Sequence, residues 1–205
     1  MTTWIAIALS VASLLMTEAA QASSAIGPRD AVESAVDRFM NLQNSRSDNA
    51  PLTAERLGQI REIVRDMFDF DEISRRALAR HWQTLQREEQ AEFVTLFRDL
   101  LERAYLAQVE TVGNEKIVFL GESSEGGGAA IVRSKVVTRQ GGQIPLDYRL
   151  HLLDGRWRIY DVVVQGISFI ASYRTQFDRV IRAESYGALR ERLQKKAAEN
   201  TAAQR

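Results

Sequence analysis

The feature that most constrains the fold is a series of apolar segments in the second half of the chain, separated by short turns. The segments that read as strands are residues 115–121, 130–138, 144–153 and 157–164. The glycine-rich stretch ESSEGGG, residues 122–128, reads as a loop. Connections this short reverse the chain direction and leave no room for a parallel crossover. The sequence therefore predicts an antiparallel sheet of about four strands.

The third segment shows which face of that sheet is buried. Within residues 144–153, Leu146, Tyr148 and Leu150 alternate with polar residues that include His151. An antiparallel sheet with this alternation has one apolar and one wet face. We expect other elements to pack on the apolar face and shield it from water.

Helical patterns fill the first half of the chain and its C-terminal end. Apolar residues recur there at the three and four residue spacing of helices that bury one face. Thr53 and Ser168 have side-chain oxygens that can cap the helices after them. The predicted helices are residues 30–44, 53–68, 71–78, 87–109, 169–184 and 186–196. The predicted fold class is α+β, with helices packed on one face of a twisted antiparallel sheet.

Composition excludes several function classes. The 205 residues contain no cysteine, which rules out thiol catalysis, cysteine-based zinc sites and disulfides. Lysine and arginine number 27 and so do aspartate and glutamate, so no net basic field favours nucleic acid as a partner.

The N-terminus has the pattern of a secretory signal. Residues 4–16 carry no charge and are too few to span a bilayer, and Ala20 and Ala22 form a small-x-small cleavage pattern. We expect a signal peptide at residues 1–22, one domain at 23–197 and a flexible tail at 198–205. Export without cysteine favours the periplasm. The alternative is an N-terminal helix that tethers the protein to a membrane.

A search for catalytic or metal-binding patterns finds none. The two histidines, His81 and His151, lack the spacing of metal ligands, and His151 is interpreted as a surface residue. Asp69 and Asp71 stand at a helix boundary, where capping is the favoured role. The sequence contains neither a phosphate-binding loop nor a GxSxG nucleophile turn. We expect no enzymatic activity, no cofactor and no metal.

Four stretches resemble the MlaC family, also called the toluene-tolerance family. They are GRWRIYDVVVQGISFIASYRTQF, FDFDEISRRALARHW, EFVTLFRDLLERAY and LRERLQKK. The resemblance extends over residues 31–196. It implies a periplasmic phospholipid carrier that maintains outer-membrane lipid asymmetry. The implied partners are an inner-membrane ABC transporter with its MCE-type substrate-binding subunit and an outer-membrane lipoprotein complex. The cargo is a bound phospholipid; a hopanoid or other hydrophobic lipid is the alternative.

A soluble lipid carrier has to be hollow. Exposing two acyl chains of about fifteen carbons to water costs on the order of 20 kcal/mol, at about 0.8 kcal/mol per methylene. An apolar pocket enclosed by the helices and the sheet avoids that cost. The candidate lipid-binding residues are Met67, Phe68, Phe97, Leu101, Tyr105, Leu146, Tyr148, Leu150, Val162, Val164, Ile167, Phe169 and Tyr173. The same residues can equally form a closed, dry core, because the sequence does not reveal a cavity.

Two further questions stay open at the level of sequence. Arg174 can pair with Asp161 across the turn at Gly166, or lie near a lipid phosphate. The rival functions are an enzyme on a cone-shaped α+β scaffold, with Tyr105, Tyr148 and Asp161 as acid or base candidates, and an exported adaptor that carries no ligand.

Overall fold

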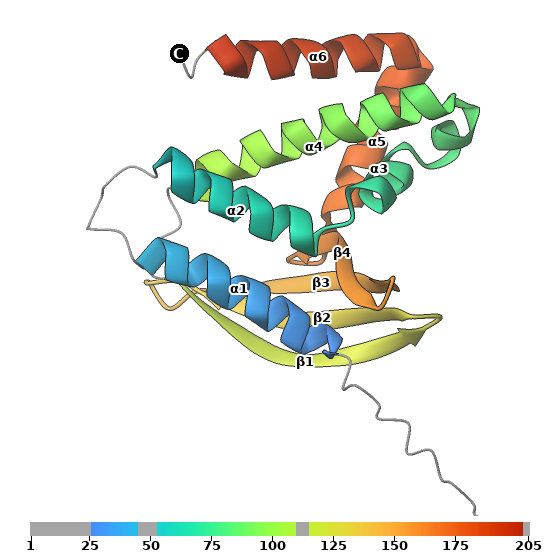
Figure 1. Cartoon of the computed structure of the whole chain (residues 1–205). Coiled ribbons are helices and arrows are strands. Elements are labelled where there is room, and N and C mark those ends of the chain that lie inside the picture. The colour runs from blue at the N-terminus through green and yellow to red at the C-terminus, as the bar shows by residue number, and fades with distance from the viewer. Residues whose placement is uncertain (1–25, 45–52, 110–114, 203–205) are drawn as a thin grey trace, which may run out of the picture.

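The computed structural model describes residues 26–44, 53–109 and 115–202, with side chains at 26–43, 53–104 and 115–198. Figure 1 shows helices stacked over one face of a sheet, which confirms the predicted α+β class. The helices are α1 (Pro28–Asn44), α2 (Ala54–Met67), α3 (Phe70–Leu78), the 3-10 helix η1 (Ala79–Thr84), α4 (Arg87–Val109), α5 (Phe169–Ala183) and α6 (Tyr186–Ala202). None of these described helices has the length and apolar character needed to cross a membrane.

The sheet has five antiparallel strands where the sequence predicts about four. They are β1 (Lys116–Gly126), β2 (Ala129–Val137), β3 (Gln143–Leu153), β4 (Arg156–Val164) and β5 (Ile167–Ser168), in that spatial order. The added strand, β5, has only two residues, with Ser168 opposite Val163. The loop predicted at residues 122–128 is wrong for its first part, because β1 continues through it. Polar residues suit an edge strand, whose backbone bonds to one neighbour only.

Capping residues set the helix starts. Thr53 accepts from the backbone N–H of Arg56, and Ser168 accepts from that of Ala171, so both predicted caps are confirmed. Helix α3 begins one residue earlier than predicted because Asp69 is its cap. The last helix, α6, continues to Ala202, beyond the predicted end at residue 196.

The buried apolar residues form two main clusters. The helical core joins α3, α4, α5 and α6 and has as its buried members Ile73, Ala77, Leu78, Phe93, Phe97, Leu101, Ile170, Phe177, Leu189 and Leu193. The sheet core joins α1 and the end of α2 to the sheet and has as its buried members Val32, Ala35, Met67, Val132, Tyr148, Leu150 and Ile159. Phe68 packs against both clusters. The two cores therefore meet at the junction between α2 and α3.

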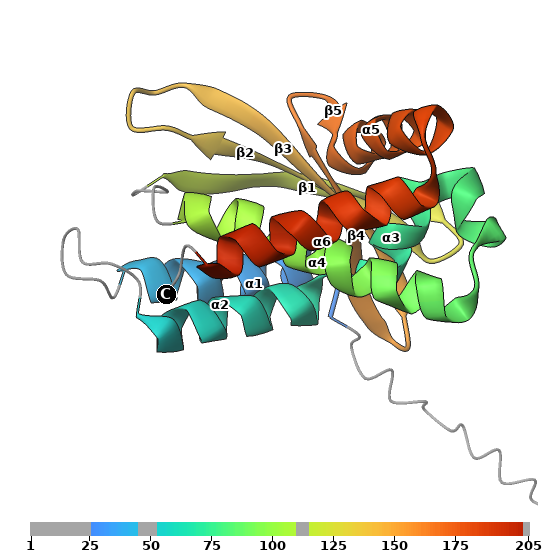
Figure 2. The same ribbon diagram turned by 90° about the horizontal axis from the view of Figure 1, so that it is seen from above.

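The layers differ in what touches the sheet. Helix α1 lies over β1 and β2, and α2, α3 and α5 contact β4. Helix α6 packs on α4 and α5 and is the helix farthest from the sheet in Figure 1; Figure 2 shows it lying across α4. Strand β4 is thus the place where the helices and the sheet come together.

Candidate lipid-binding cavity

A cavity of about 300 Å³ lies where the two cores meet. Its walls come from α2, α3, α4, β4 and the first turn of α5, through Arg61, Val64, Phe68, Phe70, Ile73, Leu101, Glu102, Tyr160, Asp161, Val162, Val164, Phe169 and Ile170. The surface that these residues present to the cavity is almost entirely apolar. Most ligand pockets measure about 300–1,000 Å³ and are mainly apolar, so this one is at the small end of that range.

Backbone pairing joins two walls of the cavity, the α2–α3 turn and strand β4. Phe68 forms an isolated parallel bridge with Ile159, and the N–H of Asp69 donates to the carbonyl of Ile159 at 2.9 Å. The turn between α2 and α3 is therefore attached directly to β4. This attachment places Phe68, Phe70 and Val162 on the walls of the same cavity.

Two residues of the cavity lining are exposed to solvent. Val164, near the end of β4, is 40% exposed. The side chain of Arg61 on α2 is 37% exposed. The remaining lining residues are buried or half-buried. We call the exposed part of the lining, at Arg61 and Val164, the mouth of the cavity.

The structure places the thirteen candidate lipid-binding residues on the cavity lining, in the cores or, as with Leu101, in both. The cavity is lined by Phe68, Leu101, Val162, Val164 and Phe169. The sheet core contains Met67, Leu146, Tyr148 and Leu150, and the helical core contains Phe97 and Tyr173. Ile167 is 67% exposed beside the mouth. The side chain of Tyr105 lies outside the described residues.

Several lining residues were not among the sequence candidates. They are Arg61, Val64, Phe70, Ile73, Glu102, Tyr160, Asp161 and Ile170. The alternation in FDF and the run ISFI mark Phe70 and Ile170 as apolar residues near element ends. Neither pattern distinguishes a cavity wall from a packed core, because both are apolar.

The carboxylate of Asp161 joins β4 to α5. It accepts hydrogen bonds from the Ser168 hydroxyl at 2.6 Å and from the backbone N–H of Ile170 at 3.1 Å. Arg149 lies 3.6 Å away on β3. The predicted pair with Arg174 is therefore wrong, because the β3–β4 register places Arg149 directly opposite Asp161. Arg174 is exposed and forms no ion pair within the described part of the chain.

The acid and base candidates of the enzyme hypothesis do not converge. Asp161 is occupied by Ser168, Ile170 and Arg149. Tyr148 is in the sheet core, where burial raises its pKa to about 12, and it does not line the cavity. A general base with access to a substrate in the cavity is therefore not formed by these two side chains.

Each histidine pairs with an aspartate. His151 lies 2.9 Å from Asp69, and His81 lies 2.8 Å from Asp178. His151 is thus half-buried and bonded to the α3 cap, where the sequence predicts an ordinary surface residue. In the ranges that the structure describes, no group of three His, Cys, Asp or Glu side chains is arranged to hold a metal ion.

Charged side chains gather at the mouth around Glu102. Its carboxylate is only 7% exposed and accepts two hydrogen bonds from Arg65, at 2.9 and 3.2 Å. Hydrogen bonding to Glu102 raises the pKa of Arg65. Arg61 and Arg98 each approach the same carboxylate to 3.9 Å. The bidentate pair connects α2 to α4 beside the cavity, whose lining includes Glu102 but not Arg65.

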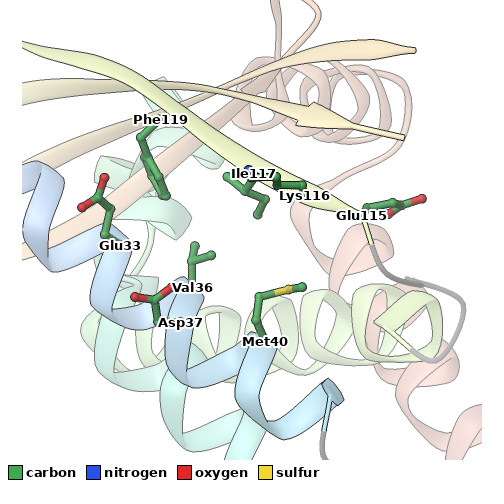
Figure 3. A pocket seen from close by; sticks show the side chains of 8 residues that line it. All are labelled: Glu33, Val36, Asp37, Met40, Glu115, Lys116, Ile117 and Phe119. Carbon is green, nitrogen blue, oxygen red and sulfur yellow. The ribbon is translucent and has the colours of Figure 1, made fainter. Parts of the chain in front are cut away.

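A second hollow, between α1 and β1, differs in chemistry. It measures about 630 Å³ and is drawn in Figure 3. Its lining combines Val36, Met40, Ile117 and Phe119 with Glu33, Asp37, Glu115 and Lys116. Three carboxylates on the lining make this groove unfavourable for hydrocarbon, because each would lose water against a lipid tail.

Two of three comparisons with known proteins find a match. Residues 33–195 match the family described as MlaC protein. A solved structure, the phospholipid-binding protein from Ralstonia solanacearum in complex with a phospholipid, superposes with a TM-score of 0.74 at 24% sequence identity. The alignment covers 84% of this chain and 97% of that chain, and it shows a shared fold. Comparison with curated protein sequences finds no match.

Proposed function

The chain belongs to the MlaC family, and from this membership together with its apolar cavity we propose that it is a non-enzymatic phospholipid carrier. The observation that carries the proposal is the cavity at the junction of the two cores. A purely structural protein of this size has no need of an almost wholly apolar space whose lining is partly exposed to solvent. The Ralstonia solanacearum relative with the same fold was solved with a phospholipid, which supports this ligand class.

The size of the cavity implies that loading widens it. A cavity of about 150 Å³ holds one benzene molecule, so a volume of about 300 Å³ corresponds to roughly a dozen carbon atoms. Two acyl chains of about fifteen carbons each need considerably more. We propose that the helical core and the sheet core move apart along their shared boundary when lipid enters. They are separate clusters joined through Phe68, so each can stay packed during this movement.

We further propose that the carrier works in the periplasm after removal of residues 1–22. It would exchange phospholipid between an outer-membrane lipoprotein complex and an inner-membrane ABC transporter with an MCE-type subunit, and so maintain outer-membrane lipid asymmetry. The predicted signal sequence and the family membership support this role. A hopanoid is the second candidate cargo, since the cavity wall selects for apolar chains and not for their class.

Extraction of the bound lipid tests the proposal. The mature protein, purified without detergent, is extracted with organic solvent, and the extract is analysed by mass spectrometry. We expect phospholipid close to one molecule per chain. A hopanoid in place of phospholipid would identify the other cargo, and a protein free of lipid both as purified and after incubation with phospholipid vesicles would exclude a carrier.

Crosslinking tests the widening of the cavity. Because the chain has no native cysteine, cysteines at positions 65 and 102 can be joined selectively by a cleavable bifunctional maleimide. We expect the crosslink between α2 and α4 to block exchange with vesicles and cleavage of the linker to restore it. The uncleaved and cleaved forms are matched controls for each other. Exchange at the same rate in both forms would contradict the proposed movement.

A further inference from the structure

The proposed function leaves the arginines at the mouth of the cavity without a role. One buried carboxylate, Glu102, is approached by three guanidinium groups, and its two hydrogen bonds come from only one of them, Arg65. One bidentate arginine neutralises a buried carboxylate and supplies two charge-assisted hydrogen bonds. Arg61 and Arg98 therefore exceed what Glu102 requires.

Arg61 retains its capacity to bind a ligand. Its Nε lies 3.9 Å from Glu102, and it makes no hydrogen bond to any residue that the structure describes. The side chain lines the cavity and is 37% exposed. The Nε of Arg98, nearby on α4, is buried and lacks a hydrogen-bond partner among the described residues. Arg61 thus has N–H donors on the cavity lining that no described protein group uses.

The negative charges around this cluster are few and partly occupied. Asp99 accepts from Arg98 at 3.4 Å, and Glu62 is an exposed neighbour on α2. Neither residue lines the cavity. On the lining itself the charged side chains are Arg61, Glu102 and Asp161, and Asp161 already accepts from Ser168 and Ile170. Arg65, one turn further along α2, does not line the cavity but is exposed and shares Glu102 with Arg61.

A phospholipid in the cavity would present such an anion at this place. Its tails occupy the apolar interior, and its phosphate follows one glycerol unit away, where the chains leave the cavity at the mouth. Arginine binds phosphate oxygens in a bidentate manner that lysine and neutral donors do not match. We propose that Arg61 and Arg65 bind the phosphate of the lipid headgroup, with Glu102 holding Arg65 at the mouth when no lipid is bound. This inference rests on the proposed carrier function.

A separate hollow lined by four arginines is the competing location for the phosphate. It includes Arg75, Arg76, Arg149 and Arg174 and shares Tyr160, Asp161 and Ile170 with the cavity. Asp161 and Ile170 are each only 5% exposed, so they separate this hollow from the tails. Three of its arginines are paired with Glu72 or Asp161, and Arg174 alone is without an ion pair within the described ranges. Arg174 therefore provides the matched control.

Lipid loading by two variants tests the assignment. The double variant Arg61→Gln/Arg65→Gln, the control Arg174→Gln and the unaltered protein are incubated with vesicles containing either phosphatidylglycerol or diacylglycerol of the same chain length. We expect the double variant to lose at least tenfold in affinity for phosphatidylglycerol and to bind diacylglycerol as the unaltered protein does. We expect Arg174→Gln to bind both lipids normally.

Other outcomes would overturn the inference. Equal losses for both lipids would show that the two arginines act only on the structure, and a selective loss in Arg174→Gln would place the phosphate in the other hollow. Because Arg61 has only one long contact, Arg61→Gln alone will fold normally, and it should show about a threefold selective loss. If the unaltered protein takes up neither lipid, the carrier function itself fails, which is a distinct result.

Glycerol phosphate separates the two sources of a phosphate group. Added at the same concentration as phosphatidylglycerol, it should leave lipid loading unchanged, because burial of the tails contributes most of the affinity. Displacement of lipid at equal concentration would assign the arginines to a free phosphate compound instead of a headgroup.

Discussion

The helical core and the cavity are built from the same residue types and share helices α3, α4 and α5, yet one is filled and the other is hollow. In the core, the rings of Phe93, Phe97 and Phe177 lie 5.1–5.7 Å apart, centroid to centroid. On the cavity wall, Phe68 and Phe70 are 6.3 Å apart and border a space of about 300 Å³. The difference shows that apolar composition does not decide whether an interior closes.

The contacts between elements differ in the two regions. Within the helical core, α3, α4, α5 and α6 form a continuous series of packed pairs. At the cavity, α2 faces α4 through the long side chains of Arg65 and Glu102. This contact between α2 and α4 is polar, whereas the contacts within the helical core are between apolar side chains. The following predictions test this division between a filled and a hollow interior.

Truncation of an aromatic residue in the filled core should have the largest effect. Phe97 is fully buried, so Phe97→Ala should lower the free energy of unfolding by about 3–5 kcal/mol. Phe70→Ala on the cavity wall should cost less than about 2 kcal/mol, since part of that ring already faces empty space. Urea unfolding of both variants measures the difference. Equal losses would contradict the distinction between the two regions.

The loss of stability at alkaline pH should show that Tyr148 is buried in the packed sheet core and not on the cavity wall. Burial raises its pKa to about 12, whereas an unfolded tyrosine titrates near 10. The folded state therefore holds the proton over this range, and its stability is present below pH 10 and is lost as the pH rises through about 12. The loss attributable to Tyr148 approaches about 3 kcal/mol.

The variant Tyr148→Phe isolates this contribution. The pH dependence of its unfolding free energy between about pH 9 and 12 should be shallower than that of the unaltered protein. Identical slopes would indicate that solvent reaches Tyr148, as it would if the cavity extended to the sheet.

A larger side chain in the cavity should lower lipid binding more than it lowers the stability of the fold. Val162→Trp places an indole in the space between β4 and the helices, so lipid occupancy should fall at least tenfold, equivalent to about 1.4 kcal/mol of binding. Met40→Trp, in the groove between α1 and β1, should leave occupancy unchanged. Lipid per chain, measured by mass spectrometry, gives both values. A loss of lipid occupancy in Met40→Trp alone would show that the lipid binds in the groove between α1 and β1.

Removal of the α3 cap should have the smallest effect. Asp69 accepts from the backbone N–H of Glu72 at 2.9 Å and pairs with His151. Asp69→Ala should lower the unfolding free energy by about 1 kcal/mol, and Asp69→Asn, which retains an acceptor, by less than half of that. Thermal unfolding compares the two variants. The same loss in both would show that the charge interaction with His151 dominates the cap.

Local sequence patterns predicted most of the elements but not their ends. The caps at Thr53 and Ser168 and the alternation in β3 depend on residues close together in the chain, so they are readable from the sequence. The continuation of β1 beyond residue 121 depends on pairing with β2, which supplies backbone partners to polar residues that would otherwise form a loop. The pairing of Asp161 with Arg149 likewise depends on the register of β3 and β4.

The sequence by itself determined the α+β class, the antiparallel order of the main strands and the resemblance to a family of lipid carriers, because periodicity, turn residues and motifs are properties of neighbouring positions. It also identified Phe68, Leu101, Val162, Val164 and Phe169, which the structure brings together on the cavity wall. Only the tertiary structure decided which apolar residues pack and which leave a void. That outcome depends on how the tertiary structure brings together residues far apart in the chain, such as Arg65 on α2 and Glu102 on α4.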